Sequence, residues 1–234
     1  MPRVRLMLTC LCDAFYGEVG IATVKVLEHA GCEVEFVEAQ TCCGQPPFNA
    51  GAWNEARRIA RHCHSALLDS PLPKVAPSSS CTAMVRHGFS ILGDLPAAPQ
   101  TFELAEFLVH ERGMIHWPST KSYPRRAALH KACHGRGLGL KDEQEMLLSS
   151  VDGLTLVPFD HAEQCCGFGG AFCITHGTLS REIGLEKIHQ VVEAGAEEII
   201  SGDMGCLMHL EGLINKHQIP LRIRHFAEVL AEVI

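Results

Sequence analysis

A pattern of four cysteines occurs twice in this 234-residue chain, and no other feature of the sequence constrains its fold as strongly. The two sets are Cys10, Cys42, Cys43 and Cys81 in the first half and Cys133, Cys165, Cys166 and Cys206 in the second. Corresponding cysteines lie 123 residues apart at the first three positions and 125 at the last. Packing alone gives little reason to keep four thiols at matched spacing, so the pattern predicts ligand chemistry performed twice.

The segments between the cysteines predict an α/β fold of two pseudo-symmetric, Rossmann-like halves with mainly parallel sheets. Strands are expected at 3–8, 32–37, 75–76, 127–131, 154–159, 198–200 and 221–223. Helices are expected at 17–30, 52–68, 82–87, 102–110, 141–150, 179–194 and 226–233. The first repeat would cover 1–115 and the second 125–234, with a linker at about 113–124. Most of the cysteines follow a predicted strand, so we expect each set at the carboxyl ends of its strands.

Composition excludes several functions. The net charge of -7 and the absence of a basic run argue against nucleic acid as a partner. No apolar run reaches the roughly 18 residues of a membrane span, and the apolar run after Met1 is too short for a signal peptide. Twelve cysteines in a chain without such a signal are typical of a reducing cytoplasm, where thiols persist as metal ligands or redox groups.

The spacing of the cysteines favours an iron-sulfur cluster over zinc. Structural zinc sites typically use short Cys-x-x-Cys knuckles, whereas here 32 residues separate Cys10 from Cys42 and 38 separate Cys43 from Cys81. Two adjacent thiolates are easier to accommodate on different irons of a cluster than on one zinc ion. The glycines that follow the cysteine pairs permit the sharp turn that this requires. Structural zinc remains the lesser alternative.

The motifs resemble the cysteine-rich CCG domain family, which includes the cysteine-rich subunit of heterodisulfide reductase and the glycolate oxidase iron-sulfur subunit. The segments Cys42-Cys43-Gly44-Gln45-Pro46, Pro77-Ser78-Ser79-Ser80-Cys81-Thr82 and Cys165-Cys166-Gly167-Phe168-Gly169-Gly170 are similar to its lactate utilization protein A branch, as is Gly205-Cys206-Leu207-Met208. The resemblance covers essentially the whole chain.

The resemblance implies an iron-sulfur electron-transfer subunit of a cytoplasmic complex that oxidises L-lactate to pyruvate, with a ferredoxin-type iron-sulfur subunit among its partners. All eight repeated cysteines would bind one or two clusters, most simply of the 4Fe-4S type. A heterodisulfide reductase-like or glycolate oxidase-like subunit is the alternative within the family. The chain departs from the fuller family pattern, which ends in Cys-x-x-Cys, because Met84 and His209 stand at the last position. His209 is therefore a further candidate ligand, and Met84 is expected in the core.

Several further expectations concern differences between the halves. Gly167, Gly169 and Gly170 expose backbone N–H groups that can hydrogen-bond cluster sulfurs, whereas the first loop carries Pro46 and Pro47. The second set is thus the safer cluster site, and two clusters would differ in reduction potential. His134, beside Cys133, is a candidate for contact with a cluster or an anionic substrate. No catalytic residue can be assigned from the sequence.

Overall fold

The protein folds into two parallel β-sheets of four strands each. The computed structural model describes residues 1–67, 70–93, 95, 96, 98 and 100–234, and all strand and helix assignments below refer to these residues. The strand order is β2-β1-β3-β4 in the first sheet and β6-β5-β7-β8 in the second. The two orders are identical once the first four strands are matched with the last four, so the sequence repeat is a structural repeat. This confirms the predicted fold class.

The first half consists of β1 (Arg3–Leu6), α1 (Cys10–Phe15), α2 (Gly17–His29), β2 (Glu33–Phe36), α3 (Gln45–Asn49), α4 (Trp53–Leu67), β3 (Lys74–Ala76), α5 (Ser79–Ala83), the π-helical turn η1 (Met84–Gly88), α6 (Phe89–Ile91), β4 (Thr101–Glu103), α7 (Leu104–Glu106) and η2 (Phe107–Glu111). The second half consists of β5 (Arg125–Leu129), α8 (Cys133–Gly137), α9 (Glu143–Ser149), β6 (Leu154–Leu156), α10 (Phe172–Thr175), α11 (Gly177–Glu193), β7 (Glu198–Ser201), α12 (Met204–His217), β8 (Arg222–His225) and α13 (Phe226–Glu232).

Matching strands pair in matching registers. Leu6 of β1 pairs with Val75 of β3, and Leu129 of β5 pairs with Ile200 of β7. β3 and β7 are buried along their whole length, as expected for inner strands of a parallel sheet covered by helices. All strands of one sheet run in the same direction, so their carboxyl ends meet at one rim.

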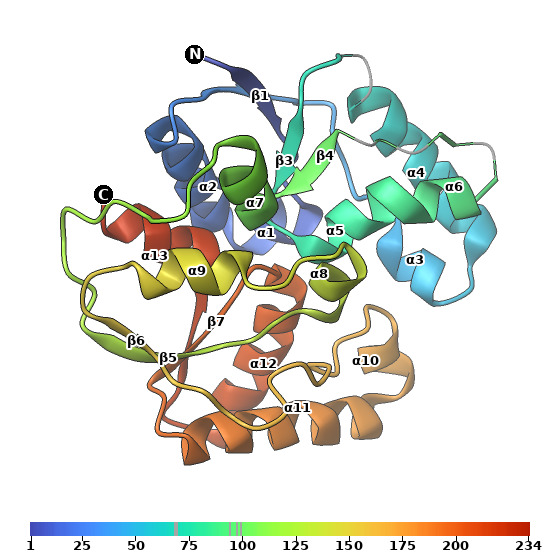
Figure 1. The fold of residues 1–234 in the computed structure, drawn as a ribbon. Helices are drawn as coiled ribbons and strands as arrows, with labels where there is room; N and C mark the ends of the chain where they lie inside the picture. The colour runs from blue at the N-terminus through green and yellow to red at the C-terminus, as the bar shows by residue number, and fades with distance from the viewer. Residues whose placement is uncertain (68–69, 94, 97, 99) are drawn as a thin grey trace.

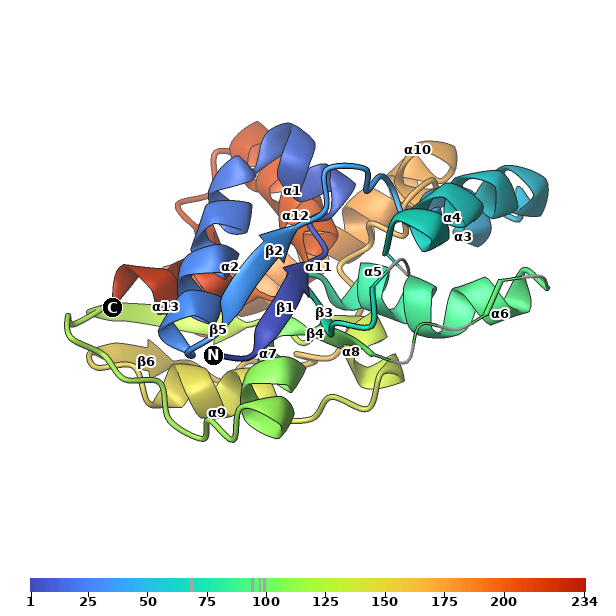
Figure 2. The same ribbon diagram turned by 90° about the horizontal axis from the view of Figure 1, so that it is seen from above.

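The two halves share one hydrophobic core. It joins Leu27 of α2 and Leu108 of η2 to Leu147 of α9 and Leu230 of α13, each of them fully buried. Figures 1 and 2 show α13, at the end of the chain, lying beside α2 near its start. A fully buried leucine contributes about 1.5–3 kcal/mol, so contacts of this kind hold the repeats together.

The segment between the repeats has no helix or strand among its described residues, 113–124. It is nevertheless anchored. Trp117 is buried and donates a hydrogen bond from Nε1 to the carbonyl of Leu230 at 2.9 Å. The repeats also meet near the centre of the molecule, where Ser78 and Asp203 form an isolated antiparallel bridge. Asp203 Oδ2 accepts hydrogen bonds from the Ser80 N–H at 2.7 Å and the Ser78 hydroxyl at 3.2 Å.

Two predictions of local structure were wrong. No strand or helix was expected in 38–49, where Pro46 and Pro47 lie, yet α3 starts there. Both prolines lie in its first turn, where a helix does not need their missing N–H groups. The expected helix 102–110 starts two residues late, because Phe102 belongs to the three-residue strand β4.

Smaller differences concern the other helices. Leu68, the last residue of the expected helix 52–68, lies outside the described residues. The prediction had no counterpart for α1, α3, α6, α8, α10 and α12. The expected helix 82–87 corresponds to α5 and η1, which together cover 79–88. Among the described residues, no helix combines the length and apolar character needed to cross a membrane.

Candidate metal centres

In each half, the four cysteines lie at the rim of the sheet where its parallel strands end. In each half, one cysteine follows the first strand, a pair follows the second strand and one follows the third strand. In the first half Cys10 begins α1 after β1, Cys42 and Cys43 lie in the loop after β2, and Cys81 lies in α5 after β3. In the second half Cys133 begins α8 after β5, Cys165 and Cys166 lie in the loop after β6, and Cys206 lies in α12 after β7. The predicted placement at the carboxyl ends of strands therefore holds for both sets.

A glycine in the left-handed conformation shapes each loop that carries a cysteine pair. Gly44 has φ of 87° and Gly167 has φ of 91°. A Cβ atom at Gly44 would lie 3.1 Å from the carbonyl oxygen of Ala56, and one at Gly167 would lie 2.5 Å from that of Ser180. Only glycine fits both the conformation and the space. The backbone N–H of each glycine donates to the sulfur two residues earlier, at 3.4 Å and 3.3 Å.

The first set of cysteines forms a connected cluster of thiols. Cys10 and Cys43 both hydrogen-bond to Cys42, and the sulfurs of Cys43 and Cys81 lie 3.4 Å apart. All four line a cavity of about 80 Å³. That volume is several times what one water molecule needs, so there is room for a group larger than one small ligand.

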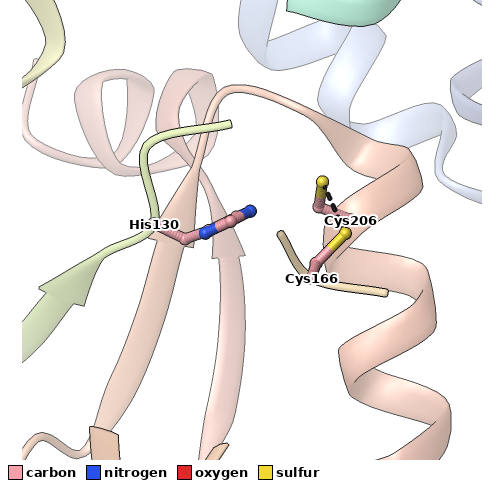
Figure 3. A group of neighbouring side chains, drawn as sticks. All are labelled: His130, Cys166 and Cys206. Carbon is pink, nitrogen blue, oxygen red and sulfur yellow. Dashed lines mark hydrogen bonds between the residues drawn. The ribbon is translucent and has the colours of Figure 1, made fainter. Parts of the chain in front are cut away.

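The second set repeats this connectivity. Cys165 hydrogen-bonds to both Cys133 and Cys166, and the sulfurs of Cys166 and Cys206 lie 2.9 Å apart. A histidine joins this set. The ligand atoms of His130, Cys166 and Cys206 lie within 4.8 Å of one another, and Figure 3 shows the imidazole pointing toward the two sulfurs.

Hydrogen bonding within each set selects one cysteine as the thiolate. The thiols of Cys10 and Cys43 donate to Cys42 and lower its pKa to about 3. The corresponding Cys165 has its pKa lowered to about 2 by the two neighbouring thiols of its own set. The pKa of each donating thiol is raised, because losing its proton would break that hydrogen bond and place a second negative charge nearby. Sulfurs that share protons in this way are suited to bind a cation, which would replace those protons.

A buried lysine lies behind the second set. Lys187 of α11 is fully buried, and its ammonium group donates to the carbonyls of His161 and Ala162, each at 3.3 Å. It also lies 5.1 Å from the ring centre of Phe159, within cation–π range. Burial lowers the pKa of Lys187 to about 8, against the attraction of the thiolates of its set.

The other candidates named from the sequence differ in their contact with the thiols. His209 Nε2 lies 3.3 Å from the carbonyl oxygen of Ser180 and 3.4 Å from its hydroxyl. His134 Nδ1 lies 3.6 Å from the sulfur of Cys133, and its Nε2 lies 3.2 Å from the side-chain amide of Gln45, in the first half. Met84 is buried in the core of the first half, as expected.

The remaining cysteines do not join the two connected sets. Cys12, Cys32 and Cys63 are buried in core clusters, and Cys173 donates to the carbonyl of Gly170 at 3.0 Å. His130 and Lys187 were not among the site residues predicted from the sequence. The signal for His130 was available in the repeat, because it lies 123 residues after Met7, as Cys133 lies 123 residues after Cys10.

The two centres are neighbours. Phe168, Met204 and Gly205 of the second half line the cavity of the first set. The cysteine loops also meet, because a Cβ atom at Gly170 would lie 3.3 Å from Cα of Pro46. Groups bound at the two sets would therefore be separated by a few side chains only.

Together, the repeated parallel sheets and the thiols at their rims define a duplicated cysteine-rich α/β protein. The family model of the CCG cysteine-rich domain matches the chain twice, over residues 4–86 and 127–211. The chain belongs to this family and, within it, to the group of lactate utilization protein A.

The curated relatives match over nearly their whole length. The chain is 39% identical over 242 residues to lactate utilization protein A of an Exiguobacterium species, covering 99% of this chain and 98% of that protein. It is 43% identical over 237 residues to the protein of the same name from Geobacillus kaustophilus, covering 97% and 98%.

A solved structure shares the fold. The crystal structure of a hypothetical protein from Helicobacter pylori aligns with a TM-score of 0.65 at 10% sequence identity. The alignment covers 99% of this chain and 48% of that one, so this chain spans about half of the solved protein. At this identity the likeness concerns the fold alone.

Proposed function

We propose that the protein is an iron-sulfur electron-transfer subunit of a cytoplasmic complex that oxidises L-lactate to pyruvate. The observation that carries the proposal is the pair of neighbouring, equivalent thiol sets, each gathered from three strand ends of one sheet. Lactate as the substrate rests on the name of the curated relatives. Among the partners we expect a subunit with ferredoxin-type clusters.

Cys10, Cys42, Cys43 and Cys81 would hold one cluster, and Cys133, Cys165, Cys166 and Cys206 the other. Three observations support this assignment: the four first-half thiols surround one cavity, the sulfurs in each set are in contact, and one thiolate per set is already stabilised. Iron-sulfur clusters, most simply of the 4Fe-4S type, accept and release single electrons without bond rearrangement in the protein.

The chain's own groups prepare the two centres for electron transfer. The left-handed glycines turn the cysteine pairs so that both members face one centre, and their N–H groups donate toward sulfur. Such donors stabilise negative charge on the ligands and tune reduction potentials. Contact between the two cysteine loops keeps the path between centres short. These features fit an electron relay in a larger complex better than a site that binds substrate.

Structural zinc is the second candidate, because four thiols within one set also suit a tetrahedral zinc ion. The proposed site of 80 Å³ and the adjacent cysteines favour the larger group. A reductase that cleaves a disulfide at its cluster, or a glycolate oxidase-like subunit, would use the same ligands with a different substrate.

Anaerobic purification followed by iron, sulfide and zinc analysis tests the proposal. We expect iron and acid-labile sulfide in equal amounts and a visible absorption band that dithionite bleaches. Zinc without sulfide would contradict the cluster assignment. Co-purification from cells grown on lactate, followed by assay of the complex with L-lactate and with glycolate, then tests the substrate.

A further inference from the structure

We propose that His130 is a fifth, nitrogen ligand of the second centre, so that this centre has a mixed sulfur and nitrogen ligand set and departs from a 4Fe-4S cluster held by four cysteines alone. The inference rests on the proposed function for the identity of the bound group, but the ligand geometry itself depends only on residues in the chain. Neither the repeat of cysteines nor the match to the CCG family singles out this histidine.

His130 lies where a ligand of the second centre would be expected. His130 directly follows β5, at the same rim as the cysteines, and its ligand atom lies within 4.8 Å of the sulfurs of Cys166 and Cys206. Figure 3 shows that its imidazole lies across from those two sulfurs, with the ring edge toward them. Metal bonds of about 2.0–2.3 Å place two donors of one tetrahedral ion about 3.3–3.8 Å apart, so a movement of about 1 Å by the side chains suffices for shared ligation.

The ring nitrogens of His130 are buried without a hydrogen bond of good geometry among the described residues. The residue is 1% exposed. The nearest backbone acceptor, the carbonyl of Ala162, also accepts a hydrogen bond from the ammonium group of Lys187 at 3.3 Å. A buried imidazole without partners is costly, and a metal is one of the few groups that would satisfy it.

The residue of the first half that corresponds to His130 is Met7. The backbone of Met7 donates to Val75 at 2.9 Å, and that of His130 donates to Ile200 at 2.8 Å, so the two residues occupy equivalent positions. A methionine at this position of the first half serves as ordinary core, because it packs with the apolar side chains of that half. A histidine in the same surroundings adds a polar ring that packing does not require.

His209 is the competing nitrogen donor, and its surroundings argue against it. Its Nε2 atom faces the backbone and hydroxyl of Ser180 on α11. Its ring lies beside Phe168, at 6.2 Å between ring centres. His209 thus has the partners that His130 lacks.

Pulsed electron paramagnetic resonance of the reduced, cluster-loaded protein tests the proposal. The protein is prepared twice, once unlabelled and once with ¹⁵N-histidine. We expect a nitrogen coupling to the cluster that changes with the label. The coupling should vanish in His130→Met, which installs the residue of the first half, and persist in His209→Leu and His134→Leu.

Absence of any coupling that responds to labelled histidine in the wild-type protein would overturn the proposal, as would a coupling that survives His130→Met. If His130→Met fails to fold, a wild-type coupling that persists in both His209→Leu and His134→Leu supports His130, and one that vanishes in either variant overturns the proposal. If the protein instead holds zinc without sulfide, the proposed function fails but the ligand does not: the same labelled protein is then loaded with Co²⁺, and the same histidine coupling is sought. Its absence there would equally overturn ligation by His130.

Discussion

The two thiol sets are alike in connectivity and differ in what surrounds them. In both, two thiols donate to one thiolate, and a left-handed glycine turns the cysteine pair. Around the first set the neighbouring positions carry Met7 and Cys63, which are uncharged. Around the second set stand His130 and Lys187. The two sets thus have equivalent cysteines, and among the described residues only the second set has a buried histidine and a buried lysine beside it.

Position-by-position equivalence makes this comparison meaningful. Gly44 faces Ala56 and Ala60 on α4, and Gly167 faces Ser180 and Gly184 on α11. Counting on three residues along each helix from Ala60 and from Gly184 leads to Cys63 and Lys187. α4 thus places an uncharged thiol, and α11 a buried ammonium group, near otherwise similar centres. We therefore expect the two centres to differ in reduction potential.

The largest expected effect comes from removing a ligand in one half at a time. Cys206→Ser should eliminate the second cluster and Cys81→Ser the first, because each removes a thiolate that a serine hydroxyl does not replace. Each variant should retain about half of the bound iron, since metal binding follows the number of complete ligand sets. Metal analysis and the spectra of reduced protein measure this. Equal, complete loss in both variants would show that the two sets bind a single group.

The glycines of the two loops provide the next comparison. Gly167→Ala should destabilise the protein more than Gly44→Ala, because the added Cβ meets a carbonyl oxygen at 2.5 Å in the second half and at 3.1 Å in the first. We expect a loss of about 2–4 kcal/mol for Gly167→Ala and about 1–2 kcal/mol for Gly44→Ala, combining left-handed strain with overpacking. Denaturant unfolding of the metal-free proteins measures both. Gly51→Ala, also in the left-handed conformation but in open space, is the control for strain alone.

The repeat made much of this architecture predictable, and local chemistry explains what was missed. Strand order and the rim of cysteines follow from two copies of one pattern, because parallel strands place their carboxyl ends together. Pro46 and Pro47 argue against a helix in the sequence, but both lie in the first turn of α3, where a helix does not need their N–H groups. Three-residue strands such as β4 give too little alternation to be seen.

The candidate site was predictable in its cysteines and not in its other members. Lys187 belongs to a helix whose pattern is that of an ordinary amphipathic one, and its burial depends on packing against the segment that contains Phe159. His130 meets cysteines that lie 36 and 76 positions further along the chain. Such arrangements arise from tertiary contact, and no single window of sequence contains them.

The helix caps that close the two halves differ in the direction of their pH dependence. His225 caps α13 with its Nδ1 accepting the Ala227 N–H at 3.1 Å, and burial lowers its pKa to about 4. Glu103 caps α7 in the same way, and burial raises its pKa to about 8. Protonating His225 removes the accepting lone pair, whereas ionising Glu103 places a charge in the core.

The stability that each cap contributes depends on pH in the opposite direction. The folded pKa of His225 lies below its unfolded value of 6.5, so its contribution is present above pH 6.5 and is lost as the pH falls toward 4. The folded pKa of Glu103 lies above 4.5, so its contribution is lost as the pH rises from 4.5 toward 8. His225→Asn should remove about 2–3 kcal/mol of the stability lost on acidification. Unfolding free energies at several pH values, with Glu103→Gln as the opposite case, measure this; parallel pH curves for wild type and His225→Asn would contradict it.

The smallest expected effect tests the buried charge behind the second centre. The Lys187 ammonium group favours the more negative, reduced state of a cluster bound there, because attraction is weakly screened in a buried site. Lys187→Met should therefore lower the potential of the second cluster by about 60 mV, a tenfold change in the one-electron equilibrium. Redox titration followed by electron paramagnetic resonance separates the two clusters. Cys63→Val, the uncharged counterpart in the first half, should leave the second potential unchanged; a second potential that does not respond to Lys187→Met would mean that the asymmetry between the halves lies in their ligands and not in their charge.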